Sequence, residues 1–216
     1  MLHWRLAEIE EFDRLFDSET MKPIHPHDQL AHRRKDTSYY NPQIKEKEDS
    51  TGNRTYRVRG TIGGDRINYP EIHLPTRVQC VRSSSSLSSA TTLVDIKDYH
   101  LNTPLSRPEY IRIQRKLIPN NIMERHKLDQ FISNNSEVNR GMYGLPQAGL
   151  LAQQRLVEHL AKHQHYQTDT PCLFRHTSNG TTFALVVDDF GVKYKDKQAA
   201  DHFIATLQQL YTIKSD

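Results

Sequence analysis

Acidic side chains follow apolar runs at two places in the sequence. The run 183-FALVV-187 ends on Asp188 and Asp189, and the run 92-TLV-94 ends on Asp95. Aspartate is common where strands turn, because its carboxylate caps and turns the chain. Adjacent like charges at the end of a strand suited to burial are nevertheless unfavourable, so these carboxylates are the first candidates for chemistry.

Carboxylates of this kind can hold metal ions. Three carboxylates cannot share a few ångströms without a cation, because each disfavours the ionisation of the others. Oxygen ligands without a nearby thiolate favour Mg²⁺ or Mn²⁺. Two such ions held by shared carboxylates activate an attacking hydroxyl and stabilise a leaving phosphate oxygen. We therefore expect Asp95, Asp188 and Asp189 to converge and to hold Mg²⁺ (or Mn²⁺).

The elements around these aspartates predict an α+β fold. In chain order we expect a strand, a helix, an antiparallel hairpin, a second helix capped by Asp196, and the start of a further strand, at 92–101, 146–164, 172–176 with 181–187, 197–211 and 212–216. This order approximates a βαββαβ plan with helices on one face of an antiparallel sheet. In such a sheet the first strand and the central hairpin are neighbours, which would bring the aspartates together.

The N-terminal half has weaker signals. Apolar residues at helical spacing predict an amphipathic helix over 4–16, and residues 17–54 have the polar composition of a long irregular segment. Alternation over 55–64 predicts a strand or hairpin with Arg57 and Arg59 on one face. A short helix is expected within 119–130. The low-complexity stretch 83-SSSSLSSATT-92 predicts no stable element.

Composition limits the class of protein. The 216 residues suffice for one large or two small domains, and the net charge of +3 permits a polyanionic partner without requiring one. Cys80 and Cys172 have no disulfide-framework or ligand spacing, which favours a reducing compartment. Neither a signal peptide nor a membrane span is recognisable, so we expect an intracellular protein with no membrane partner. The twelve scattered histidines are interpreted as solvated surface residues.

Several longer blocks occur in order along nearly the whole chain. They are 4-WRLAEIEEFDRLFDSETM-21, 57-RVRGTIGGDRINYP-70, 92-TLVDIKDYHLNTPLSRPEYIRI-113, 140-RGMYGLPQAG-149 and 186-VVDDF-190. Together they resemble the reverse transcriptase domain of the Pol polyprotein of copia-type retrotransposons. A single V-D-D is weak evidence, whereas ordered blocks at domain-like spacing are strong evidence.

The resemblance implies a polymerase fingers–palm fold with a ferredoxin-like βαββαβ palm sheet. Residues 1–90 would form a fingers-like segment, and residues 91–216 a palm that is incomplete at its C-terminus, without thumb or ribonuclease H. It implies an RNA-directed DNA polymerase that binds an RNA or DNA primer–template and deoxynucleoside triphosphates, alongside other Pol modules if the gene continues. The expected location is the cytoplasm or a virus-like particle, with the nucleus as a further possibility.

The resemblance also implies roles for single residues. Asp95, Asp188 and Asp189 would be the catalytic metal ligands. The nucleotide-binding residues would be Gln147, Arg59, Asp98 and His100. His100 stands where the family usually carries a bulky aromatic residue that excludes a 2′-hydroxyl, so sugar selectivity becomes a question.

Other interpretations remain open for these residues and for the whole chain. Gln147 could only cap its helix, and Arg57 and Arg59 could be solvated strand charges. The chain could be a non-catalytic relic of a retroelement with weak nucleic-acid binding, which the Ser-rich run 83–89 favours. A two-metal nuclease or phosphatase would use the same carboxylates to degrade a strand rather than to extend it.

Overall fold

The computed structural model describes residues 2–48, 50–69, 90–131 and 135–215. The Ser-rich run and Cys80 lie outside these residues. Mixed helices and strands build two separate sheets, which confirms the expected α+β class. In the described part of the chain, each helix is too short or too polar to span a bilayer.

The chain forms two compact units that interleave in sequence. Unit 1 comprises Met1–Ile72 with Thr103–Gly149, and unit 2 comprises His73–Asn102 with Leu150–Asp216. This division differs from the expected boundary at residue 90. The physical reason is strand pairing, because strands from the middle of the chain join the sheet of the N-terminal half.

Unit 1 contains a five-stranded sheet in the order β1-β6-β5-β2-β3. Its strands and α-helices are α1 (Leu2–Asp17), β1 (Met21–Pro23), β2 (Ser38–Glu48), β3 (Arg54–Ile62), β5 (Pro104–Arg112), α2 (Asn120–Arg125) and β6 (Asn135–Arg140). Short 3₁₀ helices lie between them, at Ala31–Asp36, Gly64–Arg66, Arg115–Leu117 and Leu128–Gln130. The expected N-terminal helix, the strand carrying Arg57 and Arg59, and the short helix after Pro119 are confirmed.

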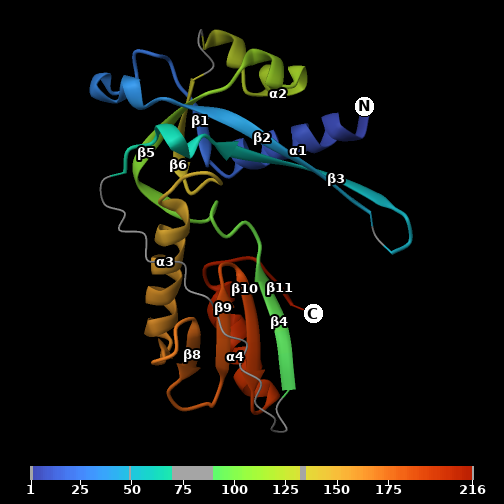
Figure 1. Cartoon of the computed structure of the whole chain (residues 1–216), viewed down its shortest axis with the longest axis vertical. Helices are drawn as coiled ribbons and strands as arrows, with labels where there is room; N and C mark the ends of the chain where they lie inside the picture. Colours follow the sequence, from blue (N-terminus) through green and yellow to red (C-terminus); the bar gives the residue numbers. More distant parts are fainter. Residues whose placement is uncertain (1, 49, 70–89, 132–134, 216) are drawn as a thin grey trace. The chain divides into compact units, whose positions relative to one another are not determined.

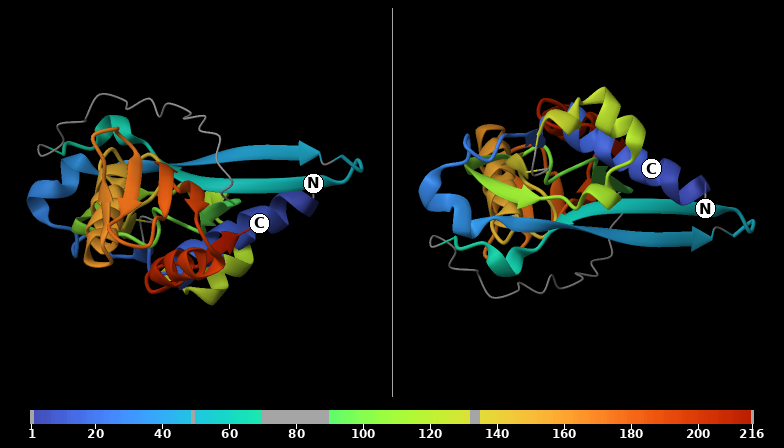
Figure 2. Two further views of the ribbon diagram at one scale, coloured as in Figure 1. Left: turned by 90° about the horizontal axis from the view of Figure 1, so that it is seen from below. Right: turned by 90° about the horizontal axis from the view of Figure 1, so that it is seen from above.

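The expectation of a long irregular segment over 17–54 is wrong. This segment contains β1, a 3₁₀ helix and β2, and β2 pairs with β3 from Tyr40 opposite Ile62 to Glu48 opposite Arg54. Most of β2 is exposed and carries no apolar alternation. Its pairing therefore rests on main-chain hydrogen bonds, which a hydrophobicity pattern does not register. Figure 2 shows the two strands as a long ribbon extending from the rest of unit 1.

Unit 2 contains a six-stranded antiparallel sheet in the order β11-β4-β10-β9-β8-β7 (Figure 1). Its elements are β4 (Ala90–Ile96), α3 (Ala148–Lys162), β7 (His165–Gln167), β8 (Leu173–His176), β9 (Thr182–Val186), β10 (Asp189–Tyr194), α4 (Lys197–Gln208) and β11 (Ile213–Ser215). The expected strand, helix, hairpin, helix and strand correspond to β4, α3, β8–β9, α4 and β11. The strands β7 and β10 are additional, and β10 rather than the β8–β9 hairpin pairs directly with β4. The predicted helices, hairpin and final strand are confirmed within a few residues.

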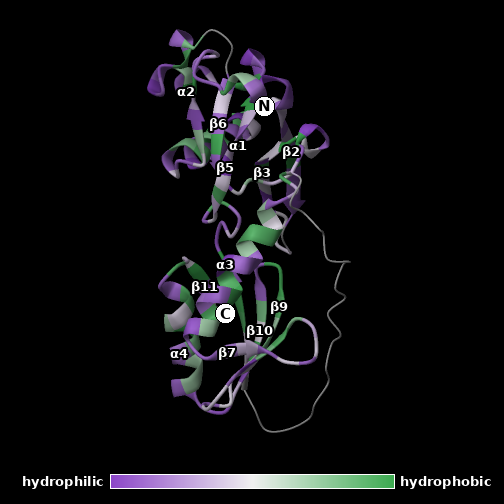
Figure 3. Ribbon diagram, turned by 90° about the vertical axis from the view of Figure 1, so that its left-hand side faces the viewer, coloured by the Kyte–Doolittle hydropathy of each residue, from purple (hydrophilic) through white to green (hydrophobic). Residues whose placement is uncertain are grey.

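One face of the unit 2 sheet carries the core. Side chains from α3 and α4 pack there against alternate residues of the strands, and the largest contributors are Leu156, Leu160, Phe174, Phe183, Phe190, Phe203 and Leu207. Val94 and Ile96 of β4 point into this core, whereas Leu93 is 65% exposed. In Figure 3, hydrophilic and hydrophobic residues alternate along α4, as expected of a helix with one buried face. The opposite face of the sheet carries charged strand residues together with exposed aliphatic ones such as Leu93 and Val186.

Asp196 caps α4, as its position before the helix predicts. Its side chain accepts a hydrogen bond of 2.9 Å from the N–H of Ala199. We expect Asp196→Ala to lower the free energy of unfolding by about 1 kcal/mol, because one N–H of the first turn loses its partner. Asp196→Asn is the matched control and should be nearly neutral, because asparagine caps as well as aspartate. Urea denaturation checks both; equal losses in the two variants would contradict the cap.

Candidate active site

The three predicted aspartates meet at one position of the unit 2 sheet. Asp95 in β4 lies directly opposite Asp189 in β10. Asp188 belongs to the two-residue connection between β9 and β10, and its carbonyl accepts a 3.1 Å hydrogen bond from the N–H of Ile96. Residues directly opposite each other on antiparallel strands have Cβ atoms about 4.5–5.5 Å apart. The strand register thus brings these three positions together as expected, while their joint binding of a metal ion stays a prediction.

These carboxylates occupy the face of the sheet that points away from the core. Strand alternation decides this, because the neighbours Ile96 and Phe190 are buried while Asp95 is half-buried and Asp189 exposed. On the other side of Asp95, its partner in β11 is Lys214. A cationic side chain therefore flanks the acidic position on the same face.

The negative charges of these carboxylates make the ionisation of Asp189 less favourable. Partial burial, then the charge of Asp188, then that of Asp95 raise the pKa of Asp189 above its ordinary value. A divalent cation would relieve this repulsion and favour the ionised forms. The ligand atoms that the three aspartates offer to a metal ion are carboxylate oxygens, so these residues fit Mg²⁺ or Mn²⁺.

The turn that carries Asp188 is conformationally strained. Val187 has a φ of +62°, in the left-handed region that a β-branched side chain rarely adopts. Val187 is also 56% exposed, so burial does not offset this conformation. The tight connection places Asp188 beside the strand that contains Asp95, which a looser loop would not do.

The loop after Asp95 is fixed by hydrogen bonds on both sides. The side chain of Asn102 donates to the carbonyls of Lys97 and Asp98, at 3.0 Å each. Arg155 of α3 donates to the carbonyl of Asn102, and the N–H of Lys97 donates to Thr212 at 2.9 Å. Asp98 itself is left-handed, with a φ of +54°. The main chain beside the aspartates is therefore held in one conformation.

Two of the expected nucleotide-binding residues, Asp98 and His100, lie in this loop. Asp98 and His100 are both half-buried, and the ring of His100 meets that of Tyr99 edge-on at 5.3 Å. Tyr99 is buried in the core, and burial, then Tyr211, then Asp188 raise its pKa, so its phenol is neutral. The sequence pattern assigned no role to Tyr99, whose buried ring packs against His100 of this loop. Contacts of Asp98 and His100 with a nucleotide stay predictions.

The other two expected residues belong to unit 1 and make internal contacts there. The guanidinium of Arg59 lies 4.0 Å from the centre of the Tyr143 ring. Gln147 is fully buried, and its Nε2 donates to Glu109 at 3.1 Å, while its Oε1 has no hydrogen-bond partner among the described residues. Arg33 also pairs with Glu109. Contacts of Arg59 and Gln147 with a nucleotide therefore stay predictions.

Gly144, in the block 143-YGL-145, has a steric role. Its φ is +91°, and a Cβ at this position would overlap the main chain of Ile62. The N–H of Ile62 donates to the carbonyl of Tyr143 at 2.8 Å. The block therefore docks against the end of β3 through a contact that only glycine permits.

The interpretation of the histidines as solvated surface residues is wrong for three of them. His159, His165 and His176 are buried in unit 2. His165 lies in a polar stretch, 163-HQHYQ-167, that gives no sign of burial. In β7 only His165 is buried, while Tyr166 and Gln167 are exposed. The burial of His165 comes from packing against Phe183 and Phe203, which the local sequence does not show.

Comparison with known proteins identifies no family. No protein-family model matches the chain, and the search of curated proteins finds no match. The geometry of the site therefore carries the functional argument together with the sequence resemblance.

Removing the charge of Asp189 should stabilise the protein at neutral pH. Its pKa in the folded state lies above the ordinary value of 3.8, so the native state holds the proton more tightly than the unfolded chain. The resulting destabilisation is complete above the folded-state pKa and disappears below about 3.8. We expect Asp189→Asn to raise the melting temperature at pH 7 and to match the wild type in acid.

Mg²⁺ provides the second arm of this experiment. Because an ion bound only by the folded state stabilises it, Mg²⁺ should raise the melting temperature of the wild type. The rise should be smaller in Asp189→Asn, which has one ligand fewer. An equal response to Mg²⁺ in the two proteins would argue against a cation held by this carboxylate.

The strain at Val187 is testable by substitution. Glycine adopts a positive φ without steric cost, although it adds flexibility to the unfolded chain. The strain of about 1–3 kcal/mol outweighs this entropy term. Val187→Gly should therefore raise the free energy of unfolding by about 1 kcal/mol, as measured in urea, whereas Val186→Gly in the adjacent strand should lower it. A loss of stability in Val187→Gly would contradict the assignment of strain.

Proposed function

We propose that the chain comprises the fingers and palm of an RNA-directed DNA polymerase of the retrotransposon Pol type. The observation that carries this proposal is the register of β4 against β10, which sets Asp95 opposite Asp189 with Asp188 in the adjoining turn. The βαββαβ order of unit 2 supports a palm sheet. Unit 1, with its extended β2–β3 ribbon, would supply the fingers.

Each group of residues near the aspartates would have a separate role in the proposed reaction. Asp95, Asp188 and Asp189 would hold Mg²⁺ or Mn²⁺, which when bound activates a primer hydroxyl and neutralises charge on the triphosphate. The loop Lys97–Asn102 would present its fixed main chain to the triphosphate. His100 would face the sugar, where its smaller ring makes exclusion of a ribonucleotide weaker than an aromatic residue would.

The polar face of the unit 2 sheet suits a nucleic-acid duplex. Lys214 lies opposite Asp95, and strand alternation puts Arg175 and Lys193 on the same face. Exposed aliphatic side chains, Leu93 and Val186, lie among them. Cationic side chains bind phosphates without regard to sequence, which is what copying of any template requires.

A non-catalytic descendant of such a polymerase is the second candidate. It is favoured by the internal engagement of Arg59 with Tyr143 and of Gln147 with Glu109. Side chains that already have partners inside the protein must leave them before they can contact a triphosphate. Such a protein would fold and bind nucleic acid weakly without extending a primer.

Primer extension on the purified chain tests the proposal. We expect extension of a labelled DNA primer on an RNA template with deoxynucleoside triphosphates and Mg²⁺ or Mn²⁺. Asp188→Asn should lower the rate by on the order of 100-fold or more, because the site loses a charged metal ligand. Asp201→Asn, which removes an exposed carboxylate from α4, is the matched control and should retain the wild-type rate.

Each alternative gives a different result. Extension that survives Asp188→Asn would contradict the metal assignment. A folded protein that binds the template and extends nothing with either metal is the outcome expected of a non-catalytic descendant. Shortening of the labelled strand in a metal-dependent way would instead identify a nuclease.

A further inference from the structure

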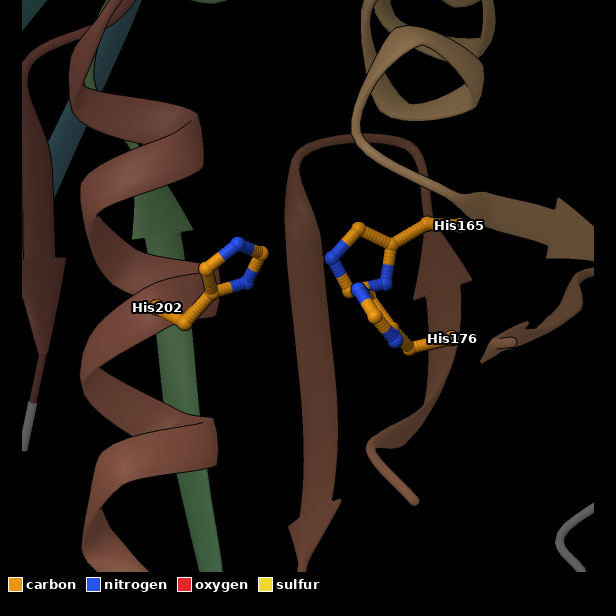
Figure 4. Close-up of side chains that lie close together, drawn as sticks. All are labelled: His165, His176 and His202. Carbon is orange, nitrogen blue, oxygen red and sulfur yellow. The ribbon is translucent and has the colours of Figure 1, made fainter. Parts of the chain in front are cut away.

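Three histidines from separate elements of unit 2 gather on the core side of the sheet. His165 begins β7, His176 ends β8, and His202 lies on α4. One nitrogen from each ring lies within 4.8 Å of the others. Figure 4 shows His202 turned from its helix toward the adjacent rings of His165 and His176.

The spacing of the rings matches a shared metal ion. Metal–nitrogen bonds of about 2.0–2.1 Å in a tetrahedral site place the centres of bound imidazole rings about 5 Å apart. The ring centres here are separated by 4.7 Å for His165 and His176, 5.3 Å for His176 and His202, and 6.1 Å for His165 and His202. Rotation of the exposed His202 side chain would close the longest of these distances.

His165 needs a ligand that the described residues do not supply. It is 1% exposed, and neither of its ring nitrogens has a hydrogen-bond partner among the described residues. A buried polar group without a hydrogen-bond partner destabilises the folded state. A neutral imidazole carries its proton on one ring nitrogen and offers a lone pair on the other, so His165 can serve as a ligand.

We propose that His165, His176 and His202 form a binding site for a transition-metal ion of the Zn²⁺ class. Neutral imidazole nitrogens suit Zn²⁺ and its neighbours, whereas Mg²⁺ requires oxygen ligands. The set of three histidines leaves a fourth position for water or a ligand. This site does not depend on the proposed polymerase function.

The site is accessible from solvent. His176 and His202 line a surface pocket together with Ser178 and Asn179 of the β8–β9 turn and residues at the start of α4. His202 is exposed, while His165 forms the inner end of the cluster. An ion can therefore reach the histidines without unfolding of the core.

Binding at His176 requires a local rearrangement. The main-chain N–H groups of Ser178 and Asn179 donate to its Nδ1 at 3.1 Å each, so the neutral ring carries its proton on Nε2. A metal ion at Nε2 moves this proton to Nδ1. The two N–H groups must then turn away, which the surface position of Ser178 permits. The amide signals of Ser178 and Asn179 therefore report occupation.

The histidine site is distinct from the aspartate site. β9 runs from the β8–β9 turn, beside His176, to the connection that carries Asp188. The N–H of His176 donates to Thr181, just before β9 begins. The two sites thus lie at opposite ends of one strand, and on opposite faces of the sheet. A bound ion would tie the edge hairpin β7–β8 to α4.

Calorimetric titration of the metal-free full chain with ZnCl₂ tests the proposal. We expect one Zn²⁺ per chain with a micromolar or tighter Kd, a rise of several degrees in melting temperature at saturation, and shifted amide signals of Ser178 and Asn179. His202→Ala removes an exposed ligand and should weaken binding at least tenfold. His165→Phe should also weaken it while the protein stays folded, because Phe183 and Phe203 already surround this ring.

Matched controls separate the histidine cluster from other zinc ligands. His27→Ala removes an exposed histidine from unit 1, and Asp188→Asn removes a ligand from the aspartate site; both should keep the wild-type Kd. Wild-type affinity in His202→Ala and His165→Phe would overturn the proposal. So would loss of zinc binding in Asp188→Asn alone, or the absence of any zinc-dependent heat and melting shift in the wild type.

Discussion

The antiparallel pairing of β4 with β10 is the constraint on which the site of this protein depends. It sets Asp95 opposite Asp189, and the short connection before β10 adds Asp188 beside them. Like charges directly opposite on paired strands destabilise a sheet. The pairing persists because burial of the neighbouring residues on the other face stabilises the sheet by more than the charge repulsion destabilises it. A bound cation would reduce this repulsion.

The register of this pair is protected by burial. Val94 and Ile96, which precede and follow Asp95, point into the core on the opposite face of the sheet. Phe190, which follows Asp189, does the same. A slip of one residue would exchange the two faces, burying the carboxylates and exposing the apolar side chains. Packing of α3 and α4 against a single face therefore fixes the position of the aspartates without touching them. Arg155 of α3 also donates a hydrogen bond to the carbonyl of Asn102, which holds the loop that follows Asp95 in place.

The same sheet offers two kinds of donor at its two ends. Carboxylate oxygens gather on the polar face at one end of β9, and imidazole nitrogens gather on the core side at the other. Hard cations and borderline transition metals prefer these donors respectively, so the two positions need not compete for one ion. The proposed catalysis at the aspartates and the proposed metal binding at the histidines are therefore compatible within unit 2.

The sequence by itself predicted the two helices, the β8–β9 hairpin and the final strand of unit 2, and the proximity of its three aspartates. Apolar periodicity, the Asn-Gly turn and the cap at Asp196 are local signals, and their order leaves few sheets that the chain can form. Tertiary structure alone decided the rest. The polar strand β2 is specified by its pairing partner, Gln147 is buried because Glu109 lies beside it, and His165 joins two histidines distant in sequence. These features arise from long-range contacts, which local residue patterns do not encode.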